Sequence, residues 1–206
     1  MYRLAHFSVE DAATCHDLIE GNEFGLLVTT GPDGAPFGTH LPFILDREAG
    51  PNGTLLAHMA RANPQWRDFG RVPVLAVFSG PHTYVSPTLY ATSPNVPTWN
   101  YAVVHAYGTP QVIGDATEVS ALMRRLSSRY EGAEGWQYDS TPDSYRAGMQ
   151  KGIVAFRIPI ERLEGKWKMS QNRTLEDRAA VRAGLAASDD AMARTVGGMI
   201  PGDDRD

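Results

Sequence analysis

Residues 24–60 read FGLLVTTGPDGAPFGTHLPFILDREAGPNGTLLAHMA, and this stretch decides the fold class. It contains three apolar segments, at residues 24–30, 38–46 and 53–60, with turn-forming residues between them at 31–34 and 49–53. Short apolar segments bounded by Gly, Pro, Asn and Asp are typical of strands joined by short turns. We therefore expect a hairpin-connected, antiparallel start to the sheet.

The rest of the chain continues this pattern. Further strands are predicted at residues 72–80, 81–87, 98–113 and 151–170. Helices are predicted at residues 8–20, 64–69, 116–130, 174–187 and 188–200, with Ser8, Asn63, Asp115, Thr174 and Ser188 at their starts, and residues 131–148 are expected to be irregular. About seven strands with few long helices between them predict a mainly β protein with flanking helices, an antiparallel barrel or sandwich.

Composition indicates one ordinary globular domain. The chain has 206 residues, of which 42% are hydrophobic, and this is enough for a sizeable core. We expect residues 1–187 to form the main domain. Residues 188–206, a helix and a tail, belong to the same domain or form an appendage.

Charge and cysteine content limit the partners and the location. A net charge of −5 does not attract nucleic acid through the overall field, so a DNA role requires a local basic patch. The single cysteine, Cys15, excludes an internal disulfide and suits a reducing compartment. No segment resembles a signal peptide or reaches membrane-spanning length, so a cytoplasmic protein without a membrane partner is expected.

One segment stands out by its polar side chains. AHMARANPQW, residues 57–66, follows an apolar strand and places Arg61 and Asn63 just before a short helix. A guanidinium beside backbone N–H groups would suit a phosphate. A second cationic group comprises Lys166, Lys168 and Arg173, and a flat aromatic ligand could be lined by Trp66, Tyr84, Trp99 and Trp167. The alternative is that Asn63 only caps a helix, Arg61 is a surface charge and the tryptophans belong to the core.

Other chemistries have little support in the sequence. The histidines at positions 40, 58, 82 and 105 lack paired metal-ligand spacing, so we expect hydrogen-bonded roles and no metal site. No GxSxG, GxGxxG or P-loop pattern occurs, and no catalytic residue can be named. Cys15 faces the apolar side of a helix, which predicts an inert thiol. The C-terminal helices carry more acidic than basic residues, which argues against a recognition helix for DNA.

Several segments together resemble the PaiB family, the FMN-binding negative transcriptional regulators. They are MYRLAHFSVED, THLPFILD, AHMARANPQW, GPHTYVSP, VPTWNYAVVHAYG, KGIVAFRI and GKWKMSQNR, which occur in this order between Met1 and about Ala186. The resemblance implies a split β-barrel of the FMN-binding type, related to pyridoxamine-phosphate oxidases. It also implies a homodimer with flavin in clefts at the subunit interface.

The resemblance further implies a set of cofactor-binding residues. Thr39, His40, Leu41 and Pro42 would lie along the isoalloxazine, and His58, Arg61 and Asn63, with Gln65 and Trp66 beside them, would meet the ribityl phosphate. Trp99 and Asn100 would approach from the dimer interface, while Lys168, Ser170, Gln171 and Arg173 would close the site.

Three functions remain open from the sequence. The first is an FMN-binding protein, with a flavin-dependent oxidoreductase activity if it is an enzyme. The second is a transcriptional regulator that acts on DNA directly or through a partner. The third is a haem-binding or haem-degrading split barrel, in which one histidine would be an axial ligand.

Overall fold

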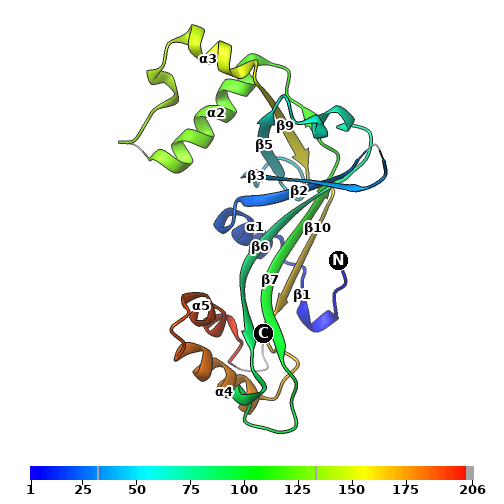
Figure 1. Ribbon diagram of the computed structural model, residues 1–206, viewed down its shortest axis with the longest axis vertical. Helices are drawn as coiled ribbons and strands as arrows, with labels where there is room; N and C mark the ends of the chain where they lie inside the picture. The colour runs from blue at the N-terminus through cyan, green and yellow to red at the C-terminus, as the bar shows by residue number, and fades with distance from the viewer. Residues whose placement is uncertain (32, 133, 203–206) are drawn as a thin grey trace. The chain divides into compact units, whose positions relative to one another are not determined.

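The structure is a computed structural model that describes residues 1–31, 33–132 and 134–202. Contacts between residues divide the chain into two compact units (Figure 1). The first unit comprises Met1–Leu18, Ser79–Val104 and Glu164–Asp206, and the second comprises Ile19–Phe78 and His105–Leu163. Pro32 of the predicted turn at 31–34 and the last four residues of the predicted tail lie outside the described residues. The predicted boundary after residue 187 stays a prediction.

The first unit is built on a sheet with the strand order β1-β10-β7-β6. Its strands are β1 (Ser8–Val9), β10 (Arg162–Lys168), β7 (Thr98–Gly108) and β6 (Val74–Val85), the last three of which also contribute residues to the second unit. Ser8 pairs with Lys166 and Val9 with Gly165, in antiparallel register. A Cβ on Gly165 would lie 2.7 Å from Sγ of Cys15, so only glycine allows this close approach of strand and helix.

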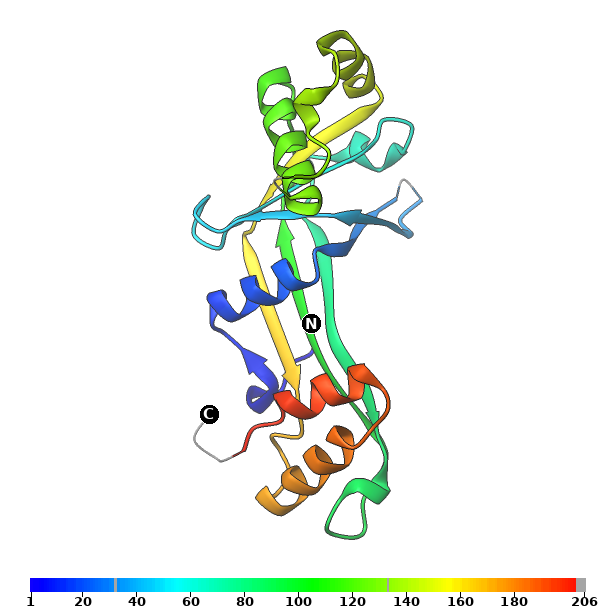
Figure 2. The same cartoon turned by 90° about the vertical axis from the view of Figure 1, so that its left-hand side faces the viewer.

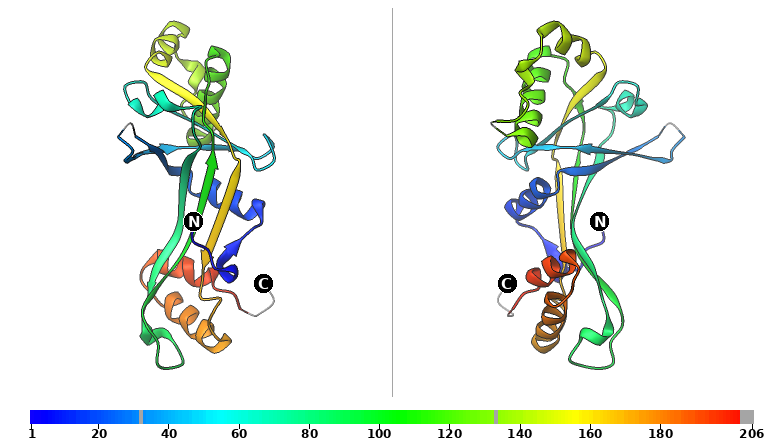
Figure 3. Two further views of the ribbon diagram at one scale, coloured as in Figure 1. Left: turned by 90° about the vertical axis from the view of Figure 1, so that its right-hand side faces the viewer. Right: turned by 60° about the vertical axis from the view of Figure 1, so that its left-hand side comes forward.

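Helices complete the first unit. They are η1 (Ala5–Phe7), α1 (Ala12–Gly21, which continues into the second unit), η3 (Pro87–Leu89), α4 (Leu175–Ala186) and α5 (Ala191–Met199). The last two pack side by side, as both views in Figure 3 show. Their buried side chains include Val181, Leu185 and Val196, which are 0%, 4% and 0% exposed. These buried side chains mark the contact face between the two helices.

The second unit contains the hairpin-rich part of the chain. One set of strands has the order β6-β2-β3, with β2 (Phe24–Thr30) and β3 (Pro36–Pro42) paired along their whole length. A second sheet has the order β4-β5-β9-β8, formed by β4 (Ile44–Asp46), β5 (Thr54–Ala60), β9 (Ile153–Pro159) and β8 (Gln111–Val112). All registered pairs among these strands are antiparallel, as residues 24–60 predicted.

Two helices of the second unit cover part of its sheet. Figure 2 shows α2 (Ala116–Glu131) and α3 (Asp143–Gln150) as neighbours, and the short helices η2 (Pro64–Asp68) and η4 (Tyr138–Ser140) belong to the same unit. Val119, Leu122 and Leu126 of α2 form one apolar cluster with Ala155 of β9. Asp115 caps α2 as predicted, because its carboxylate accepts the backbone N–H groups of residues 117 and 118.

Several predicted elements differ in their ends. Helix α1 begins at Ala12 rather than at residue 8, because residues 8–9 form strand β1 and Asp11, not Ser8, accepts the N–H of Thr14. Helix α5 is capped by Asp190 rather than by Ser188. The predicted strands 38–46, 98–113 and 151–170 are each divided in two. Conversely, the predicted strands 72–80 and 81–87 form one strand, β6.

For one segment, the predicted type of secondary structure was wrong. Residues 131–148 were expected to be irregular, but they contain η4 and most of α3. Arg146 of α3 donates to the carbonyl oxygens of Tyr138 and Thr141, and Gln150 donates to the hydroxyl of Tyr138 at 2.7 Å. These contacts fold the segment on itself, and they leave no periodic trace in the sequence. None of the described helices has both the length and the apolar character needed to cross a membrane.

Candidate functional site

The segments THLP and ARANPQW meet in the second unit. Asn63 caps η2 through its Oδ1, which accepts the backbone N–H of Gln65 at 3.0 Å. Its Nδ2 donates to Oγ1 of Thr39 on β3, also at 3.0 Å. The amide of Asn63 therefore uses both ends, one for the turn and one for the strand. The predicted helix cap is confirmed, and it also joins the two predicted binding segments.

Gln65 holds the same turn against strands β2 and β3. Its side chain is 5% exposed, and Nε2 donates to the carbonyl oxygens of Leu27 and Phe37 and to Oγ1 of Thr29, at 3.1–3.2 Å. These acceptors lie on β2 and β3. Gln65 thus positions the turn on the hairpin, and its predicted contact with a cofactor stays a prediction.

Arg61 lies in the bend between β5 and η2 with an exposed side chain. Its Nε and Nη2 donate to the carbonyl oxygens of Lys151 and Ile153 at 2.8 and 2.7 Å. The indole Nε1 of Trp66 donates to the carbonyl oxygen of Arg61, and the guanidinium lies 5.8 Å from the Trp66 ring centroid. Carbonyl groups of the chain hold one edge of the guanidinium, which leaves the Nη1 group for an anion from solvent.

His40 and His58 have different surroundings. His40 is exposed on β3 and stacks against Phe24, with ring centroids 6.0 Å apart. His58 is half-buried on β5, and its Nδ1 is buried with no hydrogen-bond partner in the described part of the chain. Burial lowers the pKa of His58, so its ring is neutral at pH 7. Unlike His82 and His105, which have polar partners at Gly80 and Tyr107, His58 departs from the hydrogen-bonded role expected for it.

The remaining predicted residues lie in the first unit. Trp99 of β7 is 54% exposed and has Tyr84 of β6 beside it, with ring centroids 6.0 Å apart. The next residue, Asn100, is fully buried, and its Nδ2 donates to Oγ of Ser170 at 3.0 Å. Ser170 has a φ of 63°, in the left-handed region that non-glycine residues seldom adopt. A residue held in this conformation is a frequent feature of functional sites.

The end of β10 and the residues after it make further contacts near Asn100 and Ser170. Lys168 donates from Nζ to the carbonyl oxygen of Trp99 at 2.7 Å and to the hydroxyl of Thr98. Burial, with positive charge at Lys166 and Arg173, lowers the pKa of Lys168. Gln171 bonds to the backbone of Met169 and Trp167, whereas Arg173 donates to Asn95 and lies 4.8 Å from the Tyr90 ring centroid.

The predicted site residues therefore form two groups. The flavin-hairpin group comprises Thr39, His40, Leu41, Pro42, His58, Arg61, Asn63, Gln65 and Trp66, all in the second unit. The lysine-loop group comprises Trp99, Asn100, Lys168, Ser170, Gln171 and Arg173, all in the first. Within each group, direct hydrogen bonds join segments that the sequence predicts to bind a cofactor.

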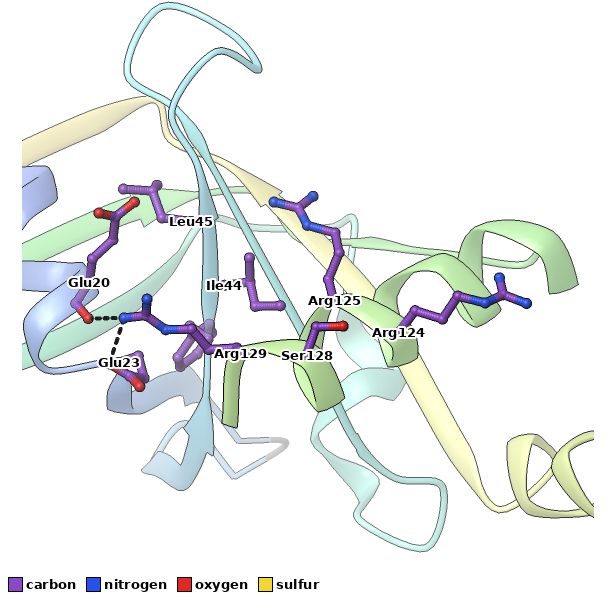
Figure 4. Close-up of a pocket in the computed structure, with 9 residues that line it drawn as sticks. Glu20, Glu23, Ile44, Leu45, Arg124, Arg125, Ser128 and Arg129 are labelled. Atoms are coloured by element: carbon purple, nitrogen blue, oxygen red, sulfur yellow. Dashed lines mark hydrogen bonds and ion pairs between the residues drawn. The ribbon is translucent and has the colours of Figure 1, made fainter. Parts of the chain in front are cut away.

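Two cavities of the second unit were not predicted. One, of about 460 Å³, is lined by three arginines of α2 (Figure 4). Each arginine has an acidic partner: Arg124 pairs with Asp139, Arg125 with Asp46 and Arg129 with Glu23. These ion pairs connect α2 to neighbouring elements. The other cavity, of about 540 Å³, is lined mostly by aromatic and apolar side chains of residues 123–153, together with Pro42 and His58. The cluster of Trp136, Tyr138 and Tyr145 was its signal in the sequence.

Comparison with known structures defines the class of the fold. The flavocytochrome Anf3 of Azotobacter vinelandii is 16% identical and has a TM-score of 0.65, with 84% of this chain and 72% of that chain covered. An FAD and haem binding protein of Mycobacterium smegmatis is 18% identical, with a TM-score of 0.59 and coverage of 78% and 73%. The fold is a split β-barrel, mainly antiparallel and with flanking helices, as predicted.

Sequence comparison then identifies the family. Residues 1–162 match the family described as "Putative FMN-binding domain", and the chain belongs to it. The Protease synthase and sporulation protein PAI 2 of Bacillus subtilis is 34% identical over 181 residues, which cover 86% of this chain and 85% of the relative. An uncharacterized protein of Emericella nidulans is 32% identical over 228 residues, with 90% of each chain covered. The PaiB resemblance is confirmed, and FMN is the cofactor of this family.

The flavin-hairpin group fits FMN. A phosphate needs an exposed cation, which Arg61 supplies, and a ribityl chain needs hydroxyl and amide groups, which Thr39 and Asn63 supply. A flavin ring needs an apolar wall, to which the half-buried Pro42 at the end of β3 can contribute, whereas Leu41 is 7% exposed and supports the strand from the core. His58, which also belongs to this group, has a buried Nδ1 with no hydrogen-bond partner among the described residues.

Proposed function

We propose that the chain is a flavoprotein that binds FMN at the flavin-hairpin group and uses it as an oxidoreductase. The observation that carries the proposal is the hydrogen bond from Asn63 to Thr39 at 3.0 Å. It places the turn that carries Arg61 beside the strand that carries Leu41 and Pro42. One ligand with an anionic end and a flat apolar end matches this pair of segments.

Arg61 is proposed to bind the phosphate. Its Nε and Nη2 are held by two backbone carbonyls, so the guanidinium is oriented before any ligand arrives. Such preorganisation strengthens binding, because less side-chain entropy is lost on contact. The start of η2 adds little, because Pro64 has no N–H and Asn63 already occupies the N–H of Gln65.

Thr39, His40, Leu41 and Pro42 are proposed to lie along the flavin ring. The flavin supplies hydride and electron transfer, whereas the chain binds the ring, orients it and limits its exposure to water. No side chain is assigned as a catalytic acid or base. His58, whose ring is kept neutral by burial, can accept or donate a hydrogen bond but does not bring a charge.

The lysine-loop group is proposed to act from a second copy of the chain in a homodimer. Trp99 and Tyr84 expose 54% and 48% of their surface beside the ordered Lys168. Exposed aromatic side chains next to a cation are typical of interface centres. Sedimentation velocity should show a dimer, and Trp99→Glu should shift it to the monomer. A monomeric wild-type protein would contradict this part of the proposal.

The central test compares FMN with riboflavin, which lacks the phosphate. Arg61→Gln should weaken FMN binding by about tenfold or more, since one hydrogen bond to a charged group contributes roughly 1.5–3 kcal/mol. Riboflavin affinity should change much less. Arg67→Gln is the matched control, because Arg67 is exposed on the adjacent η2. Equal losses for FMN and riboflavin would refute the phosphate role of Arg61.

A regulatory role is a second candidate, favoured by the name of the Bacillus subtilis relative, a protease synthase and sporulation protein. In α4 the side chain of Arg178 is 3% exposed, and in α5 Arg194 donates to the carbonyl oxygen of Ser188. These placements favour regulation through a partner over direct DNA contact. Direct binding would require a steep fall in DNA affinity with rising salt.

Haem binding is a third candidate, favoured by the unpartnered ring nitrogen of His58 and by the two similar structures, a flavocytochrome and an FAD and haem binding protein. A haem titration that gives a Soret band, lost in His58→Ala, would support it.

The predicted cytoplasmic location is in keeping with the buried lone cysteine and stays a prediction.

A further inference from the structure

The cavity of about 540 Å³ in the second unit is a formed binding space that the FMN phosphate does not explain. It lies among α2, η4, α3 and the start of β9, and the end of β3 and His58 of β5 also line it. Pockets for small molecules commonly have volumes of about 300–1,000 Å³. Its size is therefore that of a site for a small organic molecule.

Arg146, the one cation among the described residues that line this cavity, is already engaged. Arg146 donates to the carbonyl oxygens of Tyr138 and Thr141 and pairs with Asp143. The carboxylate of Glu131 accepts the backbone N–H of Trp136 at 3.4 Å. An anionic ligand would lose its hydration here without gaining a free cation among the described lining residues, and the exposed carboxylate of Glu131 would repel it. The cavity therefore excludes anions and favours an uncharged molecule.

The apolar groups of the cavity are arranged for a flat ring. Trp136 and Tyr138 form an edge-to-face pair, with centroids 6.5 Å apart and planes at 88°. Met123 and Met149, from α2 and α3, are flexible and polarisable, and they adapt to the edge of an aromatic ligand. Trp136, Tyr145 and Met149 remain 49%, 58% and 59% exposed, so large apolar surfaces face the open space.

We propose that this cavity binds an uncharged, flat compound of two or three fused rings. His58, neutral because burial lowers its pKa, and the hydroxyl of Tyr145 supply hydrogen bonds for a ring carbonyl or hydroxyl. The proposal rests on the proposed function in one respect: Pro42 and His58 belong to both the cavity and the flavin-hairpin group, so the ligand would lie beside FMN. Such a molecule is a candidate for the compound that exchanges electrons with the flavin.

The test uses menadione, a neutral two-ring quinone, with the full-length protein freed of FMN. Menadione should quench tryptophan fluorescence with a saturable dependence on concentration, and Trp136→Phe should remove the saturable part. Met149→Glu should weaken binding by at least about tenfold, because it replaces an apolar contact surface of the cavity by a hydrated carboxylate. Met192→Glu is the matched control, since Met192 is a 40% exposed methionine on α5. It should leave menadione binding unchanged.

Two further measurements separate this proposal from its alternatives. FMN should still bind to Met149→Glu, and menadione should still quench when FMN is bound. If FMN displaces menadione, the cavity is the place of the flavin ring and the inference is overturned. The inference is also overturned if Met149→Glu turns a dimer into a monomer and the monomer does not bind menadione. That result would mean that a second copy of the chain covers the cavity. Menadione binding without any FMN binding would refute the proposed function and retain the cavity site.

Discussion

Nδ2 of Asn63 donates a hydrogen bond of 3.0 Å to Oγ1 of Thr39, while Oδ1 of the same amide accepts the N–H of Gln65. One side chain thereby sets both the start of η2 and its distance from β3. Because each end of the amide has a single partner in the described part of the chain, either bond can be removed separately by mutation. Thr39 offers the cleaner change, since its replacement leaves the helix cap in place.

Thr39→Val should weaken FMN and riboflavin alike, because the turn loses its fixed position for both ligands. The free energy of unfolding should fall by about 1 kcal/mol, the usual contribution of one neutral hydrogen bond. Urea unfolding and flavin titration measure the two effects. Thr195→Val on α5, which loses a hydroxyl bond to the carbonyl oxygen of Ala191, controls for the substitution itself. An unchanged riboflavin affinity in Thr39→Val would contradict a positioning role.

The stability of the FMN-free protein should depend on pH through His58. Burial lowers the pKa of His58 in the folded state below the value of about 6.5 expected for an unfolded chain. As the pH falls through 6.5, the unfolded chain binds a proton that the folded protein excludes, so the free energy of unfolding decreases until the lower folded pKa is reached. His58→Gln should reduce this slope by up to about 1.4 kcal/mol per pH unit.

Urea unfolding at a series of pH values between neutral and mildly acidic measures the slope. His6→Gln is the control, because His6 is an exposed histidine of the first unit. A slope that is identical in His58→Gln and in the wild-type protein would show that His58 does not contribute to the acid sensitivity.

Ser170 allows backbone strain to be separated from hydrogen bonding. Ser170→Ala keeps a Cβ at φ 63° and also leaves the buried amide of Asn100 without its acceptor. Ser170→Gly leaves the same amide unpaired but relieves the left-handed conformation. We expect Ser170→Gly to be more stable than Ser170→Ala by about 1 kcal/mol. Thermal unfolding of the two variants decides this, and an equal or reversed order would mean that the conformation is not strained.

Cys15 should be unreactive in the folded protein. Its side chain is 2% exposed, and burial raises the pKa of the thiol to about 11. Because the thiolate is the reactive form, Ellman's reagent at pH 8 should modify Cys15 at least about a hundredfold more slowly than in concentrated guanidinium chloride. The protein unfolded in guanidinium is its own control. Equal rates in the two states would show that the helix opens readily around Cys15.

The sequence predicted the hairpin part of the fold well because its signals are local. Short apolar segments and turn residues within 24–60 were enough to place β2 and β5. Pro81 led to the prediction of two strands in place of β6, because a proline usually ends a strand. In β6 the described register with β2 covers only Leu75–Val77, and a strand with an unpaired edge can accept a residue that has no N–H.

The candidate site was predictable in its segments but not in its contacts. THLP and ARANPQW were singled out by their polar content, yet the bond from Asn63 to Thr39 spans residues far apart in the sequence. Sequence spacing could not show that Gln65 is buried or that Arg61 is held by carbonyl groups of residues 151 and 153. The apolar cavity depends on helix α3, which tertiary contacts of Arg146 and Gln150 stabilise.

The buried amide of Gln65 links the mobility of two segments. Because its Nε2 bonds to β2 and β3 at once, the turn at residues 61–68 cannot detach without breaking contacts to both strands. A ligand that holds this turn should therefore slow amide hydrogen exchange not only in the turn but also along β2 and β3, where it makes no direct contact with most residues. The hairpin would in this way report by its exchange rates whether the cofactor is bound.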